Sequence, residues 1–218
     1  MSNIKNSEIR VWDPMVRLFH WSLVLTFLIS YFTGDEENLL HIYTGYAVLG
    51  LIVFRLLWGI IGSRHARFSD FLYSPKKVIE YIKGLLSGKP QHYVGHNPAA
   101  GWMVIALLIS LFVASISGLK VYAVEEGKGP LAGLTTEFSL ISSANADDDD
   151  DDKEHDEHGY NDEKGGEKEG DEFWEELHEV SANLTLLLIF LHVAGVIVSS
   201  KLHKENLVKA MITGRKNA

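Results

Sequence analysis

Four histidines lie within or at the ends of long apolar segments of this 218-residue chain: His20, His41, His178 and His192. His192 follows His178 by fourteen residues. On an α-helix this is about four turns, so both imidazoles project from nearly the same face, with a rise of about 21 Å between them. An ionisable side chain at membrane depth is costly and usually marks a functional site. Two histidines on one helix, with one on each of two other helices, form a ligand set for two haems.

The segments that carry these histidines have the length of transmembrane helices. Apolar runs cover residues 15–33, 41–62, 98–118 and 175–200, and a helix needs about 20 apolar residues to cross the hydrocarbon core. The expected fold is therefore an all-α integral membrane protein, a four-helix transmembrane bundle in a single domain over residues 1–218. The N-terminus is polar and no cleavage site follows the first run, so this run is expected to be a retained helix.

The chain contains no cysteine. This excludes disulfides, thiolate-bound iron–sulfur clusters, cysteine-type zinc sites and covalently attached c-type haem. Any haem in this protein is therefore bound non-covalently, through histidine or methionine.

Basic residues predict the orientation in the membrane, although the formal net charge of the whole chain is −9. Lysine and arginine are concentrated in the N-terminal segment, in the loop of residues 63–97 and in the tail after Ser200. By the positive-inside rule these three regions are cytoplasmic, so both termini are expected inside.

A short amphipathic cytoplasmic helix is predicted in the loop of residues 63–97. Pro75 suits the first helical position with Ser74 as the N-cap, and the apolar face suits the inner membrane surface. The pair Asn97-Pro98 repeats this signal at the start of the third span.

A long acidic loop is predicted on the outer side, disordered over about residues 140–172. It includes six consecutive aspartates, Asp147 to Asp152. Low hydrophobicity and a high density of like charges favour disorder. Three interpretations remain open for this loop: a solvated spacer, a docking segment for a basic redox partner, or a site for divalent cations that includes His155 and His158.

The predicted topology pairs the four histidines by depth. His41 and His178 begin the second and fourth spans, both at the outer face. His20 and His192 lie towards the inner ends of the first and fourth spans. A haem with two axial histidines needs both at the same depth, so the expected pairs are His41 with His178 and His20 with His192. The alternative for each is a packed, hydrogen-bonded structural histidine.

Further residues could contribute to a haem site near the inner membrane face. Arg55 follows His41 by fourteen residues, so its guanidinium could pair with a haem propionate, or extend to the inner headgroups instead. Arg17 is a similar candidate. Gly45 and Gly195 lie close to the histidines and could admit a flat macrocycle or a neighbouring helix. His96 could cap a helix, contact headgroups, or serve a quinone or proton path.

Four stretches carry a resemblance to a known family: VWDPMVRLFHWSLV, HIYTGYAVLGLIVFRLLWG, GHNPAAGWMV and LHEVSANLTLLLIFLHVAGV. With these motifs the chain resembles the prokaryotic cytochrome b561 family, which includes the cytochrome b subunits of nickel–iron hydrogenases. The resemblance implies a four-helix bundle in the bacterial inner membrane with two b haems. It maps the haem ligands onto His20, His41, His178 and His192. The acidic insert departs from the family pattern.

The resulting functional hypothesis is transmembrane electron transfer through two b haems, between the membrane quinone pool and a periplasmic cytochrome c or other redox protein. As an enzyme it would be a quinol:cytochrome c-type oxidoreductase, or else only an electron carrier. Two alternatives are a membrane anchor and electron-transfer subunit of a periplasmic enzyme such as hydrogenase, and a stand-alone superoxide or quinone oxidoreductase. A metal transporter is the weakest alternative. Lipid and quinone are expected partners, and nucleic acid is not.

Overall fold

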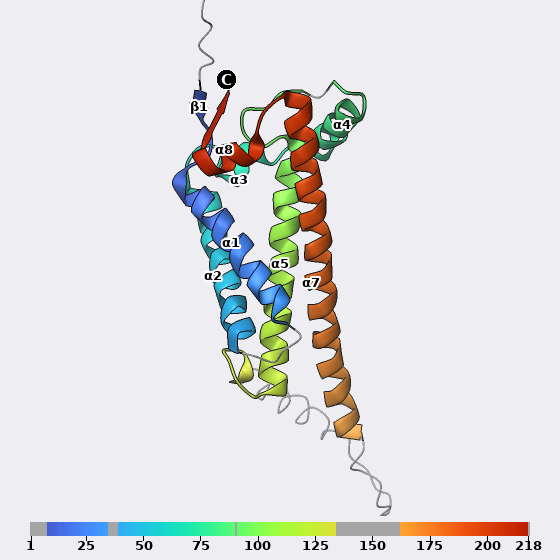
Figure 1. Ribbon diagram of the computed structural model, residues 1–218. Coiled ribbons are helices and arrows are strands. Elements are labelled where there is room, and N and C mark those ends of the chain that lie inside the picture. The colour runs from blue at the N-terminus through green and yellow to red at the C-terminus, as the bar shows by residue number, and fades with distance from the viewer. Residues whose placement is uncertain (1–7, 35–38, 90, 134–161, 218) are drawn as a thin grey trace, which may run out of the picture. The chain divides into compact units, whose positions relative to one another are not determined.

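Long apolar helices dominate the computed structural model, which describes residues 8–34, 39–89, 91–133 and 162–217. Four of its helices are long and apolar enough to cross a membrane. They are α1 (Pro14–Phe32), α2 (Leu39–Ile61), α5 (Pro98–Glu125) and α7 (Asp162–His203) (Figure 1). The prediction of an all-α membrane protein is confirmed. The six aspartates of the acidic insert lie outside the described residues.

Proline and a polar cap begin two of these helices. At α1, Asp13 Oδ1 accepts a hydrogen bond from the Val16 amide at 2.8 Å, and Pro14 takes the first helical position. At α5, Asn97 Oδ1 accepts from the Ala100 amide at 2.8 Å. α5 begins at Pro98, where the Asn97-Pro98 pair predicts the start of a helix. Each cap satisfies an amide that the first turn leaves without a helical partner.

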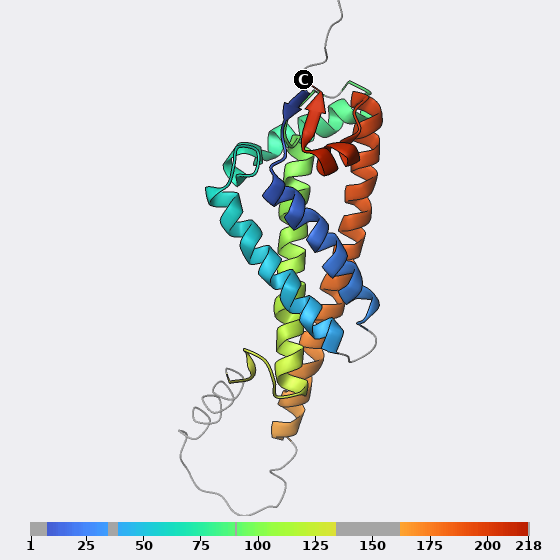
Figure 2. The same ribbon diagram turned by 60° about the vertical axis from the view of Figure 1, so that its left-hand side comes forward.

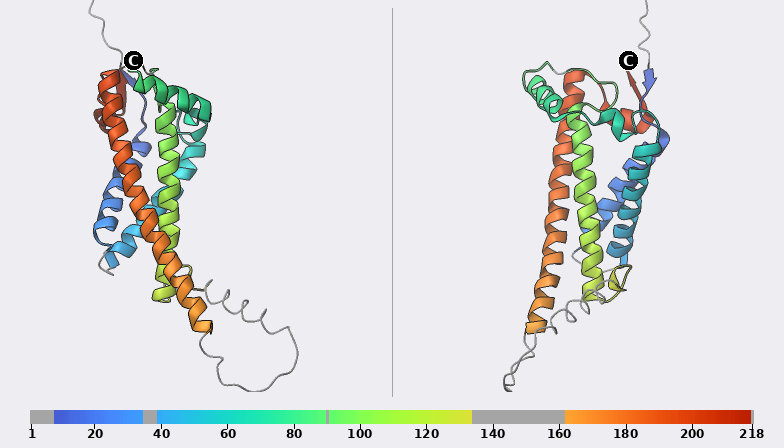
Figure 3. Two further views of the ribbon diagram at one scale, coloured as in Figure 1. Left: turned by 90° about the vertical axis from the view of Figure 1, so that its right-hand side faces the viewer. Right: turned by 180° about the vertical axis from the view of Figure 1, so that it is seen from behind.

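The predicted amphipathic helix is present as α4 (Pro75–Leu86), which follows a short helix α3 (Phe68–Phe71). Figure 3 shows α4 at the end of the molecule where α5 begins and α7 ends. Ser74 occupies the N-cap position, without a side-chain cap bond.

Two helices extend beyond their predicted bounds. The fourth span was expected from residue 175, but α7 begins at Asp162, within the stretch expected to be disordered. Acidic residues near the start of a helix complement its dipole, which favours this extension. The third span was expected to end at residue 118, but α5 continues to Glu125.

The chain forms two compact units, residues 1–112 with 183–218, and residues 113–182. In the first unit α1 packs along α2, which Figure 2 shows side by side. Its core contains Phe27, Val48, Ile52 and Leu111. In the same unit the hydroxyls of Ser110 on α5 and Thr185 on α7 lie 2.6 Å apart in a buried hydrogen bond. Such small polar pairs join helices in an apolar environment.

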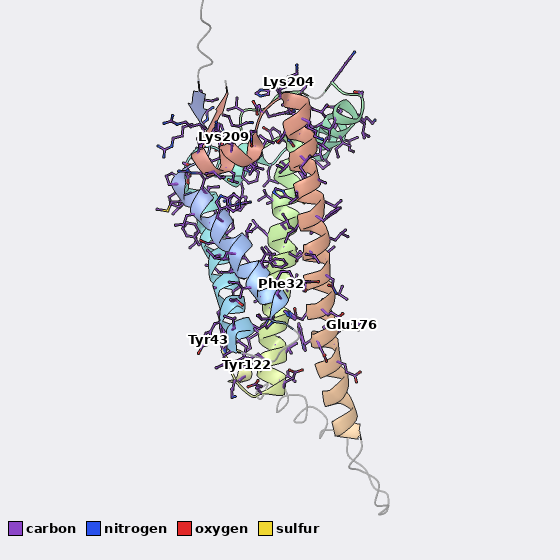
Figure 4. All side chains as sticks on the ribbon, viewed as in Figure 1. Phe32, Tyr43, Tyr122, Glu176, Lys204 and Lys209 are labelled. Atoms are coloured by element: carbon purple, nitrogen blue, oxygen red, sulfur yellow. The ribbon has the colours of Figure 1, made fainter. Side chains whose placement is uncertain are left out.

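Large apolar side chains remain exposed along the spans, as expected of surfaces that meet lipid. Phe32 on α1 and Tyr43 on α2 are 78% and 65% exposed, and Figure 4 labels both at the end of the first unit away from α8. Aromatic side chains are favoured at membrane interfaces.

The two ends of the chain meet in the first unit. Strand β1 (Glu8–Arg10) pairs antiparallel with β2 (Arg215–Asn217), and α8 (Leu207–Thr213) precedes β2. We call the part of the first unit made of β1, α3, α4, α8, β2, their loops and the adjoining halves of α1, α2, α5 and α7 the basic end.

A charged network fixes β2 to the loop before α5. The buried Lys216 ammonium lies 3.0 Å from Glu205 Oε2 and donates to the carbonyls of Tyr93 and Val94, both at 3.3 Å. His92 Nε2 lies 2.9 Å from Glu205 Oε1. Glu205 therefore joins the tail to the segment that leads into α5.

This network predicts a loss of tail protection in acid. Partial burial alone would raise the pKa of Glu205, but hydrogen bonds from His92 and Lys216 lower it below its ordinary value of 4.5. A lowered folded pKa means that the stabilisation is fully present above 4.5 and is lost as the pH falls through the folded value. Hydrogen exchange at the amides of 215–217, corrected for intrinsic rate, is expected to accelerate in that range.

The same effect is expected at neutral pH for Glu205→Gln. Loss of charged hydrogen bonds worth about 2 kcal/mol corresponds to roughly thirtyfold faster exchange at these amides. Glu126→Gln is the matched control, since the Glu126–Lys128 pair is exposed. Unchanged protection in Glu205→Gln would contradict the role given to this carboxylate.

Candidate functional site

His41 and His178 share one local arrangement. Nδ1 of His41 lies 2.9 Å from the carbonyl oxygen of Ser30 on α1. Nδ1 of His178 lies 2.8 Å from the carbonyl oxygen of Ala114 on α5. A carbonyl can only accept, so in each neutral ring Nδ1 carries the proton and Nε2 carries the lone pair. This tautomer, fixed by a backbone acceptor, is the one that metal-binding imidazoles use.

A glycine makes room for the ring of His178. A Cβ atom on Gly118 would lie 2.8 Å from Cε1 and 3.0 Å from Nδ1 of His178. The absence of a side chain on α5 therefore lets the imidazole approach the helix and reach the Ala114 carbonyl. Sequence reasoning missed Gly118 because it was taken as the end of the third span. Hydropathy falls at this glycine, so no signal in the sequence indicated that α5 continues to Glu125.

His20 and His192 both belong to the first unit, on α1 and α7. Both rings are partly buried, and they lie close enough to interact electrostatically. Nδ1 of His20 is buried and has no hydrogen-bond partner among the described residues. His20 thus lacks the carbonyl contact that orients His41. Because His41 and His178 belong to different units, their pairing stays a prediction.

Arg55 is buried inside the first unit, with 3% of its surface exposed. Its guanidinium carbon lies 4.9 Å from the ring centroid of Phe68 and 5.8 Å from that of Phe71. Its Nη1 is buried and has no hydrogen-bond partner in the described part of the chain. Arg55 therefore does not extend to the surface. A guanidinium with an unused buried donor suits an anionic oxygen ligand such as a carboxylate.

His96 lies near Arg55 and His192. Its ring packs between Trp12 and Phe71, with centroid distances of 4.5 and 4.6 Å. Desolvation, followed by the positive charge of Arg55, lowers the pKa of His96 to about 3, so the ring is neutral at pH 7. Its Nδ1 is buried and has no partner within the described ranges. The capping role considered for His96 belongs to Asn97.

Arg17 has a structural contact. Its Nη1 donates to the carbonyl oxygen of Ile212, which holds α8 against the start of α1. Its Nε is buried and has no hydrogen-bond partner among the residues that the structure describes. A role for Arg17 toward a propionate stays a prediction.

Two glycines leave space on the helices that carry the histidines. Apart from the nearby backbone of the same helix, no atom of the described residues lies within 4 Å of a Cβ built on Gly45 of α2 or on Gly195 of α7. A flat ligand could therefore approach both backbones. The described residues contain no group of three or more histidine, aspartate or glutamate side chains able to hold a metal ion. A haem iron requires only two axial ligands from the protein, so histidine pairs are sufficient for it.

Comparison with known proteins identifies a family whose pattern covers these residues. The family described as prokaryotic cytochrome b561 matches residues 11–214, a range that includes all four candidate histidines. The chain is similar to a probable Ni/Fe-hydrogenase B-type cytochrome subunit of Rhizobium leguminosarum bv. viciae. The two are 21% identical over 241 aligned positions, which cover 98% of this chain and 90% of that relative.

Two further relatives carry the same name. The protein of Bradyrhizobium diazoefficiens is 27% identical over 150 residues, covering 55% of this chain and 59% of the relative. The protein of Rhodobacter capsulatus is 26% identical over 154 residues, covering 57% and 59%. The chain thus spans about three fifths of the length of these two. No solved structure matches it.

Gly118→Ala tests the ring placement on which the site depends. The added methyl would lie 2.8 Å from Cε1 of His178, so the ring must move away from the Ala114 carbonyl. Loss of that bond lowers the basicity of Nε2 and changes the ligand field of an iron bound there. We expect the paramagnetic resonance spectrum of one oxidised haem to change.

Gly50→Ala is the matched control, because apart from its own helix backbone no atom of the described residues lies within 4 Å of the added methyl. It exchanges the same residue types on an apolar helix and should leave every haem signal unchanged. Identical spectra for Gly118→Ala and the wild type would show that His178 is not oriented in this way or is not a ligand.

Proposed function

The chain belongs to the prokaryotic cytochrome b561 family, and we propose that it transfers electrons across a bacterial inner membrane through two b haems. The electrons pass between the quinone pool and a redox enzyme on the outer side. Membership of a membrane cytochrome b family and four membrane-length helices establish membrane electron transfer with haem b. We further propose the number of haems, their ligands and the two redox partners.

The observation that carries the proposal is that His20 on α1 and His192 on α7, both partly buried, lie within electrostatic range of each other in one compact unit. These residues are 172 positions apart in the chain, yet the fold brings both imidazoles into one region at the basic end. We assign them as the axial ligands of one haem. His41 and His178, with matching tautomers, are assigned as the ligands of the other.

The surroundings of His20 and His192 fit a haem rather than a packed structural pair. A haem presents two carboxylates, and the buried Nη1 of Arg55 is a donor without a partner in the described residues. His96 supplies a second neutral imidazole beside it. Gly195, three residues after His192 and exposed, places no side chain between the helix and a macrocycle. We assign Arg55, with His96 next to it, to the propionates of this haem.

The haem iron supplies reversible one-electron chemistry when it is bound. The protein residues determine how this chemistry is used. An iron held by two histidines would favour electron transfer over oxygen binding. The positive charge of Arg55 would stabilise its reduced state, which carries one more electron. The apolar helices exclude water from the ligands.

The proposed partner follows from the relatives, which are named as probable cytochrome subunits of Ni/Fe-hydrogenases. We propose that this chain serves an enzyme of that kind, so that anchoring and electron transfer are combined in one subunit. By the positive-inside rule, the lysines of α4 and of the tail support a cytoplasmic location of the basic end. The partner would then meet the opposite end. A cytochrome c partner would depend on the acidic insert, which lies outside the described residues.

Haem counting on detergent-purified protein tests the ligand assignment. The wild type is expected to contain two b haems per chain in a pyridine haemochrome assay. His20→Ala and His178→Ala should each lose one of them, and the reduced-minus-oxidised spectra of the two variants should differ. His203→Ala is the control, because His203 lies beyond the apolar part of α7 and should not affect haem content. A wild type without haem, or full retention in both variants, would refute the assignment.

Arg55→Leu tests the charge at the basic end. Removing a buried positive charge disfavours the reduced state, so the midpoint potential of one haem should fall by roughly 60 mV, a tenfold shift in a one-electron equilibrium. Arg55→Lys keeps the positive charge, so its midpoint potential should stay close to that of the wild type. Potentiometric titration followed by absorbance measures both. A fall in both potentials to the same extent would indicate general loosening of the fold instead.

A further inference from the structure

A basic pocket lies where α7 ends and α8 follows. It has a volume of about 590 Å³ and is lined entirely by residues between 204 and 216. Its charged lining consists of four cations and one carboxylate: Lys204, Lys209, Arg215, Lys216 and Glu205. Figure 4 labels Lys204 at the end of α7 and Lys209 on α8. The pocket lies outside the region of the histidine ligands and does not depend on the proposed function.

Internal contacts already engage much of the polar lining. Glu205 is paired with Lys216 at 3.0 Å and with His92 at 2.9 Å. Its carboxylate is therefore already engaged within the protein. Asn206 accepts from the Lys209 amide at 2.8 Å, and Thr213 donates to the Lys209 carbonyl at 3.0 Å. These contacts hold the wall of the pocket without using the side chains of Lys204 or Lys209.

Lys204 and Lys209 differ from the rest of the lining. Both residues are exposed, and in the described part of the chain neither ammonium group makes a hydrogen bond or an ion pair. Lys204 also has a φ of 53°, a left-handed conformation that is uncommon outside glycine. The chain therefore turns sharply at this lysine. Two unneutralised cations remain available for an anion from outside the protein.

The position along α7 places these cations at the level of lipid headgroups. The apolar part of α7 ends near Ser200, and Lys204 follows four residues later, a rise of about 6 Å along a helix. Phosphates of a bilayer lie just beyond the hydrocarbon core, within reach of lysine side chains there.

Helix α8 supplies an apolar edge beside the lysines. Val208 and Ile212, four residues apart and so on one face, are 51% and 58% exposed. On another face, Ala210 is buried and Met211 packs against Val11 and Trp12. An apolar strip next to lysines, at the end of a membrane span, is the pattern of a segment that lies in the membrane interface.

We propose that this pocket binds the phosphate of an anionic phospholipid headgroup. Lys204 and Lys209 would pair with the headgroup, while Val208 and Ile212 contact the adjoining acyl chain. Basic pockets between membrane helices on the cytoplasmic side can bind anionic headgroups in this way. Inorganic phosphate has the same charged group but no acyl chain, so only a lipid also uses the apolar edge of α8.

The test is lipid retention by the full-length haem-loaded protein. Wild type and Lys204→Gln/Lys209→Gln are reconstituted in nanodiscs of phosphatidylcholine containing phosphatidylglycerol, extracted in mild detergent, and examined by native mass spectrometry. Each lysine near a membrane surface contributes about a fivefold change in affinity for anionic lipid, so a large loss of bound phosphatidylglycerol is expected in the double variant. Lys76→Gln/Lys77→Gln on α4 removes equal charge elsewhere and is the matched control.

The outcomes are distinct. Loss of phosphatidylglycerol in the double variant, with retention in the control, supports the site. Equal retention in all three proteins, or no preference for phosphatidylglycerol over phosphatidylcholine, overturns it. Displacement of the lipid by millimolar inorganic phosphate also overturns it, because the pocket would then be a site for soluble phosphate. Val208→Ser/Ile212→Ser gives a second check, since only a lipid site loses affinity when the apolar edge is removed.

Discussion

The absence of water in the hydrocarbon core is the constraint on which this structure depends. Every backbone group of a span must find its partner within the protein, which selects the helices. The same requirement applies to polar side chains. Thr44 and Ser117 donate to carbonyls one turn back, both at 2.8 Å, and Ser110 pairs with Thr185 across helices. The contacts of His41 and His178 with backbone carbonyls follow the same rule. In these two histidines, the hydrogen bond that satisfies the buried Nδ1 also sets the tautomer that a metal requires.

The basic end departs from this rule, and the departure is informative. Buried nitrogen atoms of Arg17, His20, Arg55 and His96 have no hydrogen-bond partner within the described residues. An unsatisfied buried polar group costs about 1–3 kcal/mol, and more when it is charged. Four in one region of a small membrane protein are difficult to explain by packing. A ligand with carboxylates and a metal would offset this free-energy cost, so cofactor binding and stability at this end are expected to be coupled.

The sequence was sufficient where the physics is local or periodic. Hydropathy located the four spans, and the Asn97-Pro98 pair located the start of α5 to the residue. The extension of α5 through Gly118 was not visible, since hydropathy falls there while the helical hydrogen bonds continue. Backbone acceptors such as the Ala114 carbonyl have no sequence signature. The Glu205 network joins residues more than one hundred positions apart, which no local pattern predicts. The pairing of His20 with His192 by depth stays a prediction, since it depends on a haem between them.

On the proposed ligand sets, the two pairs present different environments to iron. At His41 and His178 each Nδ1 donates to a carbonyl, which makes the ligating nitrogen more basic and favours oxidised iron. At His20 this bond is absent and the charge of Arg55 is near, and both features favour reduced iron. The two effects act in the same direction, so the haem at the basic end should have the higher potential. Electrons would then move towards that end, and a lower potential there would contradict the assignment. The direction of transfer thus follows from which histidines find a backbone acceptor.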